Sequence, residues 1–199
     1  MANLSLILMK IGNKFQAILE HSVPDSVQEI SDLAYMKVLA KDDVHLTRAS
    51  LTHFTASAFV LNETHDKVLG IFHKIYNSWG FMGGHCDGES DLLFVAHKEA
   101  REESGLSALT ALQECPISLE IGAVAPHTHR TRGYVSCHLH LNLTFLFEAN
   151  EADALMINTD ETRGVAWIPK DEFVEKTTEP EMRIIHEKII SRIKQRFIK

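Results

Sequence analysis

Apolar and polar residues alternate over several stretches of the chain after residue 50, and a period of two is typical of β-strands. The longest such stretch is Tyr134–Phe147, in which successive side chains would point to opposite faces. Shorter strands are predicted on either side of it, at Phe54–Leu61, Lys67–Tyr76, Ser118–Val124 and Val165–Ile168. We therefore expect a sheet in this part of the chain.

Apolar residues at helical spacing mark the two ends of the chain. Residues 1–50 are predicted to be largely helical, because Ser26 and Glu29 match a capping box and an apolar stripe follows, formed by Ile30, Leu33, Ala34 and Val38. A closing helix is predicted at Glu181–Phe197, with one apolar side formed by Ile185, Ile189, Ile193 and Phe197. We expect an N-terminal helical extension, residues 1–50, and a main domain, residues 51–199, with a mixed sheet between helices.

A third helix is predicted in the middle of the domain, and it carries most of the chemistry. Ser90 is its expected N-cap, and Gly105 stands where a left-handed residue would end it. Its carboxylates at i, i+3 and i+4, from Glu99, Glu102 and Glu103, share the face of the apolar stripe. A solvated acidic run would lie on the opposite side, with Lys98 and Arg101. Three converging carboxylates indicate a hard cation, because Mg²⁺ and Mn²⁺ prefer oxygen ligands.

The segment from Gly84 to Leu106 resembles the Nudix box, the signature of the Nudix hydrolase family. The overall spacing matches, and the three Glu residues, Gly105 and Leu106 fall at their expected positions. Two positions depart from the signature: Ser90 occupies the position of its first Glu, and Lys98 occupies the position of its Arg. Either Glu89 or Asp91 is expected to pair with Lys98 instead. The run from Gly83 to Ser90 also resembles a bacterial subgroup with Gly-Gly-His-any-Asp-Gly in this loop.

The resemblance implies an α/β/α sandwich that hydrolyses a pyrophosphate bond in a nucleoside diphosphate linked to another moiety, with Mg²⁺ or Mn²⁺ as cofactor. It adds a backbone carbonyl of Gly83 or Gly84 to the ligands supplied by the three Glu residues. Glu102 or Glu103 is the expected general base, because neighbouring like charges raise a pKa toward neutrality. Asp160 and Glu161 precede the Trp167 strand, where the resemblance implies an acid that approaches the metal site or helps to activate water; the alternative is an ordinary polar turn.

Two other functions stay open for the same fold. One is a non-catalytic sensor that binds a nucleotide-like ligand, although three intact acids argue against lost catalysis. The other is an isomerase of an allylic diphosphate, which would need a dedicated proton donor and a second metal site. A flat activity profile with clear ligand binding would indicate the sensor, and reaction products without a phosphate ester would indicate the isomerase.

The polar face of the long strand is the expected substrate contact. His138, His140, Asn142 and Thr144 alternate there with an apolar face formed by Cys137, Leu139, Leu141, Leu143, Phe145 and Phe147. Arg130 and Arg132 precede the strand, and their planar guanidinium groups suit phosphate oxygens. A face that simply meets water is the alternative. A transition-metal site at His127, His129, His138 and His140 is a third interpretation, for which no spacing is diagnostic.

Trp79, just before the glycine loop, has two interpretations. Its side chain either packs in the core or stacks on a base or ring of the ligand.

Composition limits the partners. A net charge of −7 disfavours non-specific nucleic-acid binding, which relies on basic surface, so the expected partner is a small molecule. Three unpaired cysteines, Cys86, Cys115 and Cys137, indicate free thiols in a reducing, cytoplasmic compartment. The apolar segment Leu4–Met9 is too short for a signal peptide or a membrane span. Oligomeric state is undetermined at this level, and a homodimer is left open.

Overall fold

Two long strands at the centre of the sheet organise the structure. The computed structural model describes residues 14–74, 76–129, 133–157 and 162–197. Within it, β1 (Thr52–Asn62) and β9 (His138–Ala149) run parallel and stay in register from Thr52 opposite Leu139 to Asn62 opposite Ala149. Both strands are almost entirely buried, which requires that both faces of the sheet be covered.

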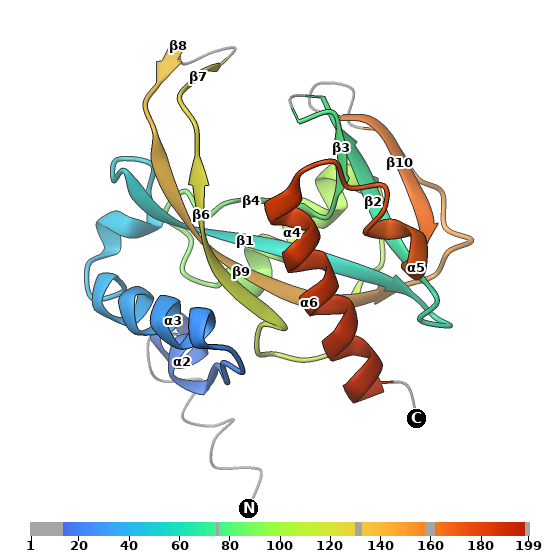
Figure 1. Ribbon diagram of the computed structural model, residues 1–199, viewed down its shortest axis with the longest axis horizontal. Helices are drawn as coiled ribbons and strands as arrows, with labels where there is room; N and C mark the ends of the chain where they lie inside the picture. Colours follow the sequence, from blue (N-terminus) through green and yellow to red (C-terminus); the bar gives the residue numbers. More distant parts are fainter. Residues whose placement is uncertain (1–13, 75, 130–132, 158–161, 198–199) are drawn as a thin grey trace, which may run out of the picture.

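The remaining strands add to the outer edges of this pair. β4 (Met82–His85) and β2 (Lys67–His73) pair with the first and second halves of β1, and β2 in turn pairs with β3 (Ser78–Gly80) and β10 (Thr162–Pro169). On the other side, β6 (Ser118–Val124) and β5 (Thr110–Ala111) pair with β9. All these pairings are antiparallel, so the sheet is mixed as predicted. A separate hairpin of β7 (His127–His129) and β8 (Gly133–Val135) projects from one end (Figure 1).

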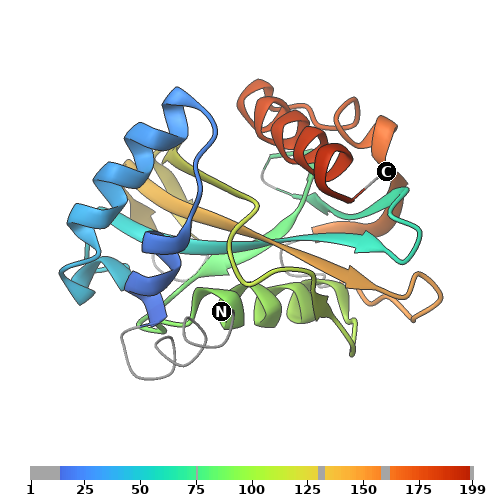
Figure 2. The same cartoon turned by 90° about the horizontal axis from the view of Figure 1, so that it is seen from below.

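Helices lie on both faces of the sheet, which confirms the expected fold class. The acidic helix α4 (Leu92–Ser104) covers one face and α6 (Pro180–Phe197) the other (Figure 2). The core below α4 contains Phe54, Leu141 and Phe145, whereas the core below α6 contains Phe59, Leu146 and Ile189. Short elements complete the chain: α2 (Lys14–His21), the 3-10 helix η1 (Asp43–Leu46) and α5 (Lys170–Phe173).

The helix α3 (Val27–Leu39) lies along the outer edge of β6. Its Glu29 accepts a hydrogen bond from the backbone N–H of Leu119 (3.2 Å), and its Asp32 accepts one from that of Ile121 (3.0 Å). These two donors belong to the edge of β6 that faces away from β9, where a strand would otherwise present unpaired N–H groups. The N-terminal helices therefore satisfy and cover an edge of the sheet.

Glu29 also joins this edge to the closing helix. Its carboxylate is buried and forms ion pairs with Arg192 (2.6 Å) and Lys188 (3.0 Å) of α6. Burial alone would raise the pKa of Glu29, but the hydrogen bonds from Arg192 and Lys188 outweigh it and lower that pKa to about 2. The carboxylate is therefore charged in the folded protein at neutral pH.

The same carboxylate explains an error in the predicted face of α3. Ser26 caps the helix as expected, accepting from the N–H of Glu29 (3.2 Å). However, Ile30 and Val38 of the predicted stripe are exposed, and the buried positions are Glu29, Leu33 and Met36, at i, i+4 and i+7. A search for apolar residues alone cannot find a face that includes a paired, buried acid.

The start of α4 also differs from the prediction. Asp91, not Ser90, is the N-cap, and its side chain accepts from the N–H of Phe94 (3.2 Å). The N–H groups of Ser90 and Asp91 both donate to the Glu89 carboxylate, which shapes the turn before the helix. Gly105 ends the helix in the left-handed conformation, as predicted, with φ of 77°.

Two of the predicted strands have different bounds for topological reasons. The stretch Tyr134–Phe147 is broken, because its first residues pair in the β7–β8 hairpin while β9 begins at His138, so that Cys137 lies exposed between them. β2 ends at His73 rather than Tyr76, because a turn follows that leads into β3. Alternation indicates which side chains face the core but not which strand each segment pairs with.

Within the described ranges, no helix combines the length and apolar composition needed to cross a membrane.

We predict that Glu29→Gln lowers the free energy of unfolding by about 3 kcal/mol at pH 7, because it removes the charge that Arg192 and Lys188 share in a buried setting. The folded pKa lies below the ordinary value of 4.5, so this stabilisation is present above about pH 4.5 and is lost as the pH falls toward 2. Urea unfolding at pH 7 and pH 3.5 should show a wild-type advantage that shrinks by about 1 kcal/mol. The matched control is Glu20→Gln, whose partner Lys37 is a surface residue. An advantage that is constant over this range would contradict the assignment.

We predict that Asp91→Ala destabilises the protein by about 1 kcal/mol through loss of the cap, whereas Ser90→Ala stays within about 0.5 kcal/mol of wild type. Asp91→Asn separates the cap from the ion pair between Asp91 and Lys14, since Asn can still accept from the Phe94 N–H. Chemical denaturation of the three variants measures the differences. If Ser90→Ala costs as much as Asp91→Ala, the cap has been assigned to the wrong residue.

Candidate active site and histidine cluster

Two of the three predicted acids converge on the glycine pair of β4. The buried carboxylate of Glu103 accepts a hydrogen bond from the backbone N–H of Gly83 (3.0 Å). The carboxylate of Glu99 lies directly over Gly84, where a β-carbon would come within 2.4 Å of Glu99 Cδ. Glycine is therefore required at residue 84 by the close approach of α4 to β4. The packing of α4 against β4 places carboxylate oxygens next to the backbone of the glycine pair.

The third acid is placed differently from the prediction. Glu102 is exposed and does not face the sheet. Lys98 forms ion pairs with Glu99 (3.0 Å) and with Glu102 (3.2 Å), instead of lying on the opposite side or pairing with Glu89 or Asp91. The long, flexible lysine side chain reaches both neighbours from its own turn of the helix. Its charge offsets part of the repulsion among the acids, and a bound cation would have to compete with it.

The polar face of β9 lies on the other side of the sheet from α4, and it is tied into a hydrogen-bonded network. Asn142 Oδ1 accepts from the hydroxyls of Thr55 (3.0 Å) and Ser57 (2.8 Å), and its Nδ2 donates to Glu120 (2.8 Å). Glu120 is itself buried and paired with Lys188 (3.3 Å). The amide of Asn142 is thus occupied by protein groups, and its contact with substrate stays a prediction.

The partners of Asn142 could not be found from the sequence, because they come from other strands. Thr55 and Ser57 alternate within a strand that was correctly predicted, but only the parallel register places them beside Asn142 and Thr144. Glu120 faces the same network from β6. Pairwise register between distant strands is not encoded in the alternation of either strand.

The histidines of β9 belong to a cluster that the sequence revealed only in part. His138 and His140 are joined by His53 from β1 and His85 from β4, and the four imidazoles each place a ring nitrogen within 4.8 Å of the others. His127 lies next to the cluster, with its ring 6.0 Å from that of His138, but it is not a member. The side chain of His129 and all of Arg130 and Arg132 fall outside the described residues.

Burial keeps several of these imidazoles neutral. It lowers the pKa of His85 to about 3, assisted by the nearby charge of Arg48, and lowers that of His140 to about 3, assisted by His53. Burial also lowers the pKa of His53. Arg48 is held by two hydrogen bonds to Asp87, each of 2.6 Å, so its charge is largely offset locally.

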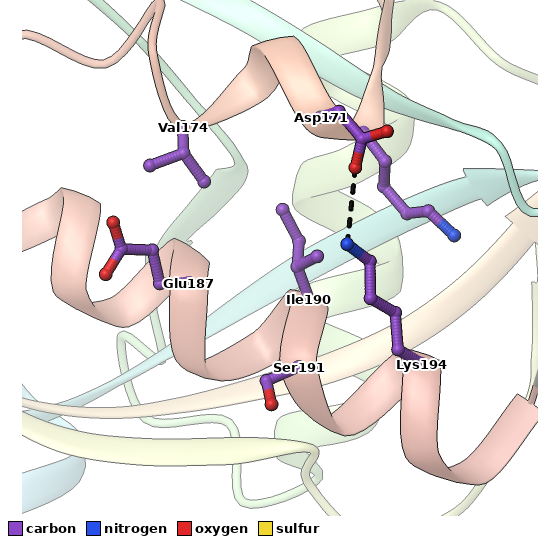
Figure 3. A pocket seen from close by; sticks show the side chains of 7 residues that line it. Asp171, Val174, Glu187, Ile190, Ser191 and Lys194 are labelled. Carbon is purple, nitrogen blue, oxygen red and sulfur yellow. Dashed lines mark hydrogen bonds and ion pairs between the residues drawn. The ribbon is translucent and has the colours of Figure 1, made fainter.

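The remaining predicted positions have separate outcomes. Glu161 lies outside the described residues. Trp79 packs edge-on against Phe72, with ring centroids 5.5 Å apart, and contacts the core below α6, which favours the core interpretation. A surface pocket between α5 and α6 contains an ion pair of Asp171 and Lys194 and none of the predicted site residues (Figure 3).

Comparison with known proteins identifies the family. The NUDIX domain family matches residues 51–192, and the chain belongs to that family. This confirms the expected family and the expectation of a hydrolase. Comparison with curated protein sequences found no match.

Solved structures share the fold at low sequence identity. A NUDIX family hydrolase from Clostridium perfringens is 19% identical, with a TM-score of 0.53, over 70% of this chain and 96% of that one. A C. elegans Ap4A hydrolase in a binary complex is 15% identical, with a TM-score of 0.52, over 71% and 98%. The E. coli dihydroneopterin triphosphate pyrophosphohydrolase is 14% identical, with a TM-score of 0.53, over 69% and 94%.

We predict that Gly84→Ala destabilises the protein by about 1–3 kcal/mol, because the new methyl group overlaps the Glu99 carboxylate and forces α4 or that side chain to move. The matched control is Gly80→Ala, since a β-carbon at residue 80 meets nothing within 4 Å. Thermal and urea unfolding of both variants measure the difference. Equal stability of the two variants would show that Glu99 does not pack on Gly84.

Proposed function

We propose that this protein hydrolyses a pyrophosphate bond in a nucleoside diphosphate linked to another moiety, with Mg²⁺ or Mn²⁺ as cofactor. The observation that carries the proposal is the approach of the Glu99 and Glu103 carboxylates to the Gly83–Gly84 backbone within a Nudix box. Water is the second substrate. One P–O bond of the anhydride breaks, a new P–O bond forms to the water oxygen, and two phosphate esters leave.

The residues present fit a hard divalent cation. Carboxylate and carbonyl oxygens are the donors that Mg²⁺ and Mn²⁺ prefer, and the set contains no sulfur or imidazole. We assign Glu99 and Glu103 as ligands, with a carbonyl of Gly83 or Gly84 and with Glu102 as a further ligand or base. When bound, the ion neutralises charge that develops on the phosphoryl oxygens.

The protein groups have distinct roles in this proposal. The Gly83 N–H fixes the orientation of the Glu103 carboxylate, and the contact with Gly84 fixes that of Glu99. Glu102 is exposed, so its carboxylate is accessible to water and is the better placed of the two proposed bases to accept the proton of the attacking water. Lys98 holds Glu99 and Glu102 before the ion binds.

Substrate recognition is assigned to the polar face of β9, on the side of the sheet opposite to α4, and to the segment before that strand. We propose Arg130 and Arg132 as phosphate contacts and His138, His140 and Asn142 as residues that line the binding region, with Glu161 as a possible second acid.

The subgroup with Gly-Gly-His-any-Asp-Gly is supported by Gly83, Gly84, His85, Asp87 and Gly88. The match of the family to residues 51–192 supports the division at residue 50, and the three free cysteines support a reducing, cytoplasmic location.

Two structural neighbours guide the choice of substrates to test. One is described as an Ap4A hydrolase and another as a dihydroneopterin triphosphate pyrophosphohydrolase. The panel should therefore contain dinucleoside polyphosphates, nucleotide sugars, ADP-ribose, coenzyme A and nucleoside triphosphates. Product analysis by ³¹P NMR identifies the bond that breaks. Release of phosphate esters supports hydrolysis, an intact diphosphate in a rearranged product indicates an isomerase, and binding without turnover indicates a sensor.

We predict that Glu103→Gln reduces kcat on the best substrate at least about 100-fold. Gln retains an oxygen that can accept from the Gly83 N–H but lacks the charge that holds a cation, so the fold should be preserved. Affinity for Mn²⁺, measured by electron paramagnetic resonance, should fall together with turnover. Glu102→Gln should lose turnover with a smaller loss of Mn²⁺ affinity.

The matched control is Glu187→Gln, an exposed carboxylate on α6 outside the proposed site. It should leave kcat and Mn²⁺ affinity unchanged. A Glu103→Gln enzyme that keeps more than about a tenth of the wild-type kcat would refute the assignment of Glu103.

A further inference from the structure

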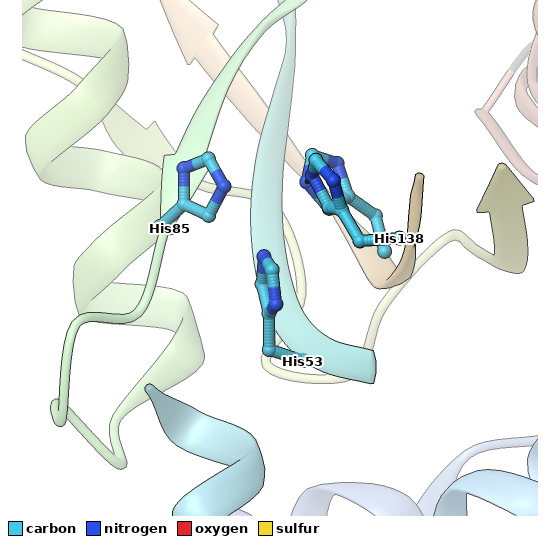
Figure 4. Close-up of side chains that lie close together, drawn as sticks. His53, His85 and His138 are labelled. Carbon is cyan, nitrogen blue, oxygen red and sulfur yellow. Dashed lines mark hydrogen bonds between the residues drawn. The ribbon is translucent and has the colours of Figure 1, made fainter. Parts of the chain in front are cut away.

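Four histidines from three strands meet on the face of the sheet that points away from α4. His53 comes from the start of β1, His85 from the end of β4, and His138 and His140 from the start of β9. Figure 4 shows His53, His85 and His138 extending toward one another from these strands. The ring centroid of His53 lies 5.1–5.3 Å from the ring centroids of the other three histidines. Strand register creates this meeting, because His53 is directly opposite His140.

Backbone carbonyls fix the orientation of two of the rings. His53 Nδ1 is 2.8 Å from the carbonyl oxygen of Ser50, and His138 Nδ1 is 2.9 Å from that of Ser136. A carbonyl oxygen only accepts, so Nδ1 carries the proton, and in the neutral ring Nε2 presents a lone pair to the cluster. Histidine ligands of metals commonly have this arrangement, in which the other ring nitrogen donates to a carbonyl.

The buried Nε2 of His53 has no hydrogen-bond partner. His53 is only 4% exposed, so water does not provide an obvious substitute. Buried polar atoms are nearly always satisfied, and an orphaned acceptor among three other imidazoles indicates a missing electrophile. A metal cation would accept this lone pair.

The spacing of the nitrogens is compatible with one ion. His138 Nε2 and His140 Nε2 are 3.2 Å apart and share a hydrogen bond, which a bound ion would replace. This distance is close to the separation of about 3.3 Å that ligands have in a tetrahedral zinc site with Zn–N of about 2.0–2.1 Å. The most distant pair of ligand atoms in the cluster is within 4.8 Å. If the separations between the ligand nitrogens shortened by up to about 1.5 Å, all four nitrogens would reach coordination distance, and rotation of the side chains can supply this movement.

The cluster is separate from the acidic site, although both involve β4. Adjacent residues of a strand point to opposite faces, so Gly84 faces Glu99 of α4 whereas His85 faces the cluster. The two donor sets also differ chemically. Oxygen donors favour Mg²⁺ and Mn²⁺, whereas imidazole donors favour zinc and the later transition metals.

We propose that His53, His85, His138 and His140 bind a divalent transition-metal cation of the zinc class. The ion would cross-link β1, β4 and β9 at one end of the sheet, and it would hold the strand that carries Gly83 and Gly84. The site is additional to the Mg²⁺ or Mn²⁺ of the proposed hydrolase, and ion binding does not require that activity. Because His138 and His140 are also proposed to line the substrate-binding region, the ion would lie at one wall of that region.

The first experiment measures zinc binding to untagged, chelator-treated protein by competition with a chromophoric chelator. We expect one equivalent of Zn²⁺ per chain and a rise in the thermal midpoint when Zn²⁺ is added. His53→Asn and His138→Asn should each weaken binding at least tenfold. In both, the asparagine amide can still donate to the carbonyl of Ser50 or Ser136, while the Nε2 ligand atom is removed.

His127→Asn is the matched control. His127 Nδ1 also lies near the carbonyl of the residue two positions earlier, Ala125 (3.0 Å), yet His127 is outside the cluster. This variant should bind zinc as the wild type does. Glu103→Gln should also bind zinc normally, which separates the cluster from the acidic site. Zinc affinity that is unchanged in both cluster variants, or that is lost in Glu103→Gln, would overturn the proposal.

A second measurement does not depend on the folding of any variant. Co²⁺ added to the wild-type protein should give the strong visible absorption of a four-coordinate nitrogen site, and equimolar Zn²⁺ should abolish it. The protein concentration should be well above that of the zinc titration. If the spectrum then shows nothing beyond the weak absorption of hydrated Co²⁺, the proposal is overturned.

Discussion

Parallel hydrogen bonding between β1 and β9 aligns two buried strands residue by residue, and both the core and the polar face depend on this alignment. His53 lies opposite His140, Thr55 opposite Asn142, and Phe54 opposite Leu141. Because side chains alternate, His53, Thr55, His140 and Asn142 fall on one face, whereas Phe54 and Leu141 fall on the face below α4. A shift of β9 by one residue would turn His140 and Asn142 toward α4 and Leu141 away from it, so the apolar packing below α4 holds the register of the polar face.

Strand β4 connects the two faces with four residues. Gly84 admits the Glu99 carboxylate on the α4 side, whereas Gly83 lies against Ser57 and His85 joins the histidines on the other side. The backbone N–H of Gly83 additionally orients Glu103. Any displacement of this short strand would therefore alter the acidic site and the histidine cluster together.

The N-terminal helices contribute to the sheet by covering its β6 edge. Carboxylates of Glu29 and Asp32 accept the outward N–H groups of β6, and Glu29 is held by Arg192 and Lys188 of α6. A buried carboxylate is stable only when such partners neutralise it. The extension, the edge strand and the closing helix are consequently linked through one side chain, which gives residues before the family match a structural role.

The sequence by itself determined the family, the positions of the main helices and strands, and the acidic helix with its glycine terminus. These features depend on local periodicity, capping and the spacing of Glu99, Glu102, Glu103 and Gly105, all of which lie within a few turns of one helix. Only the tertiary structure decided which carboxylates face β4, which helix face of α3 is buried, and that His53 and His85 join His138 and His140. Those outcomes depend on contacts between segments far apart in the chain, where strand register and buried ion pairs are set by the packing of the whole domain and not by any local pattern.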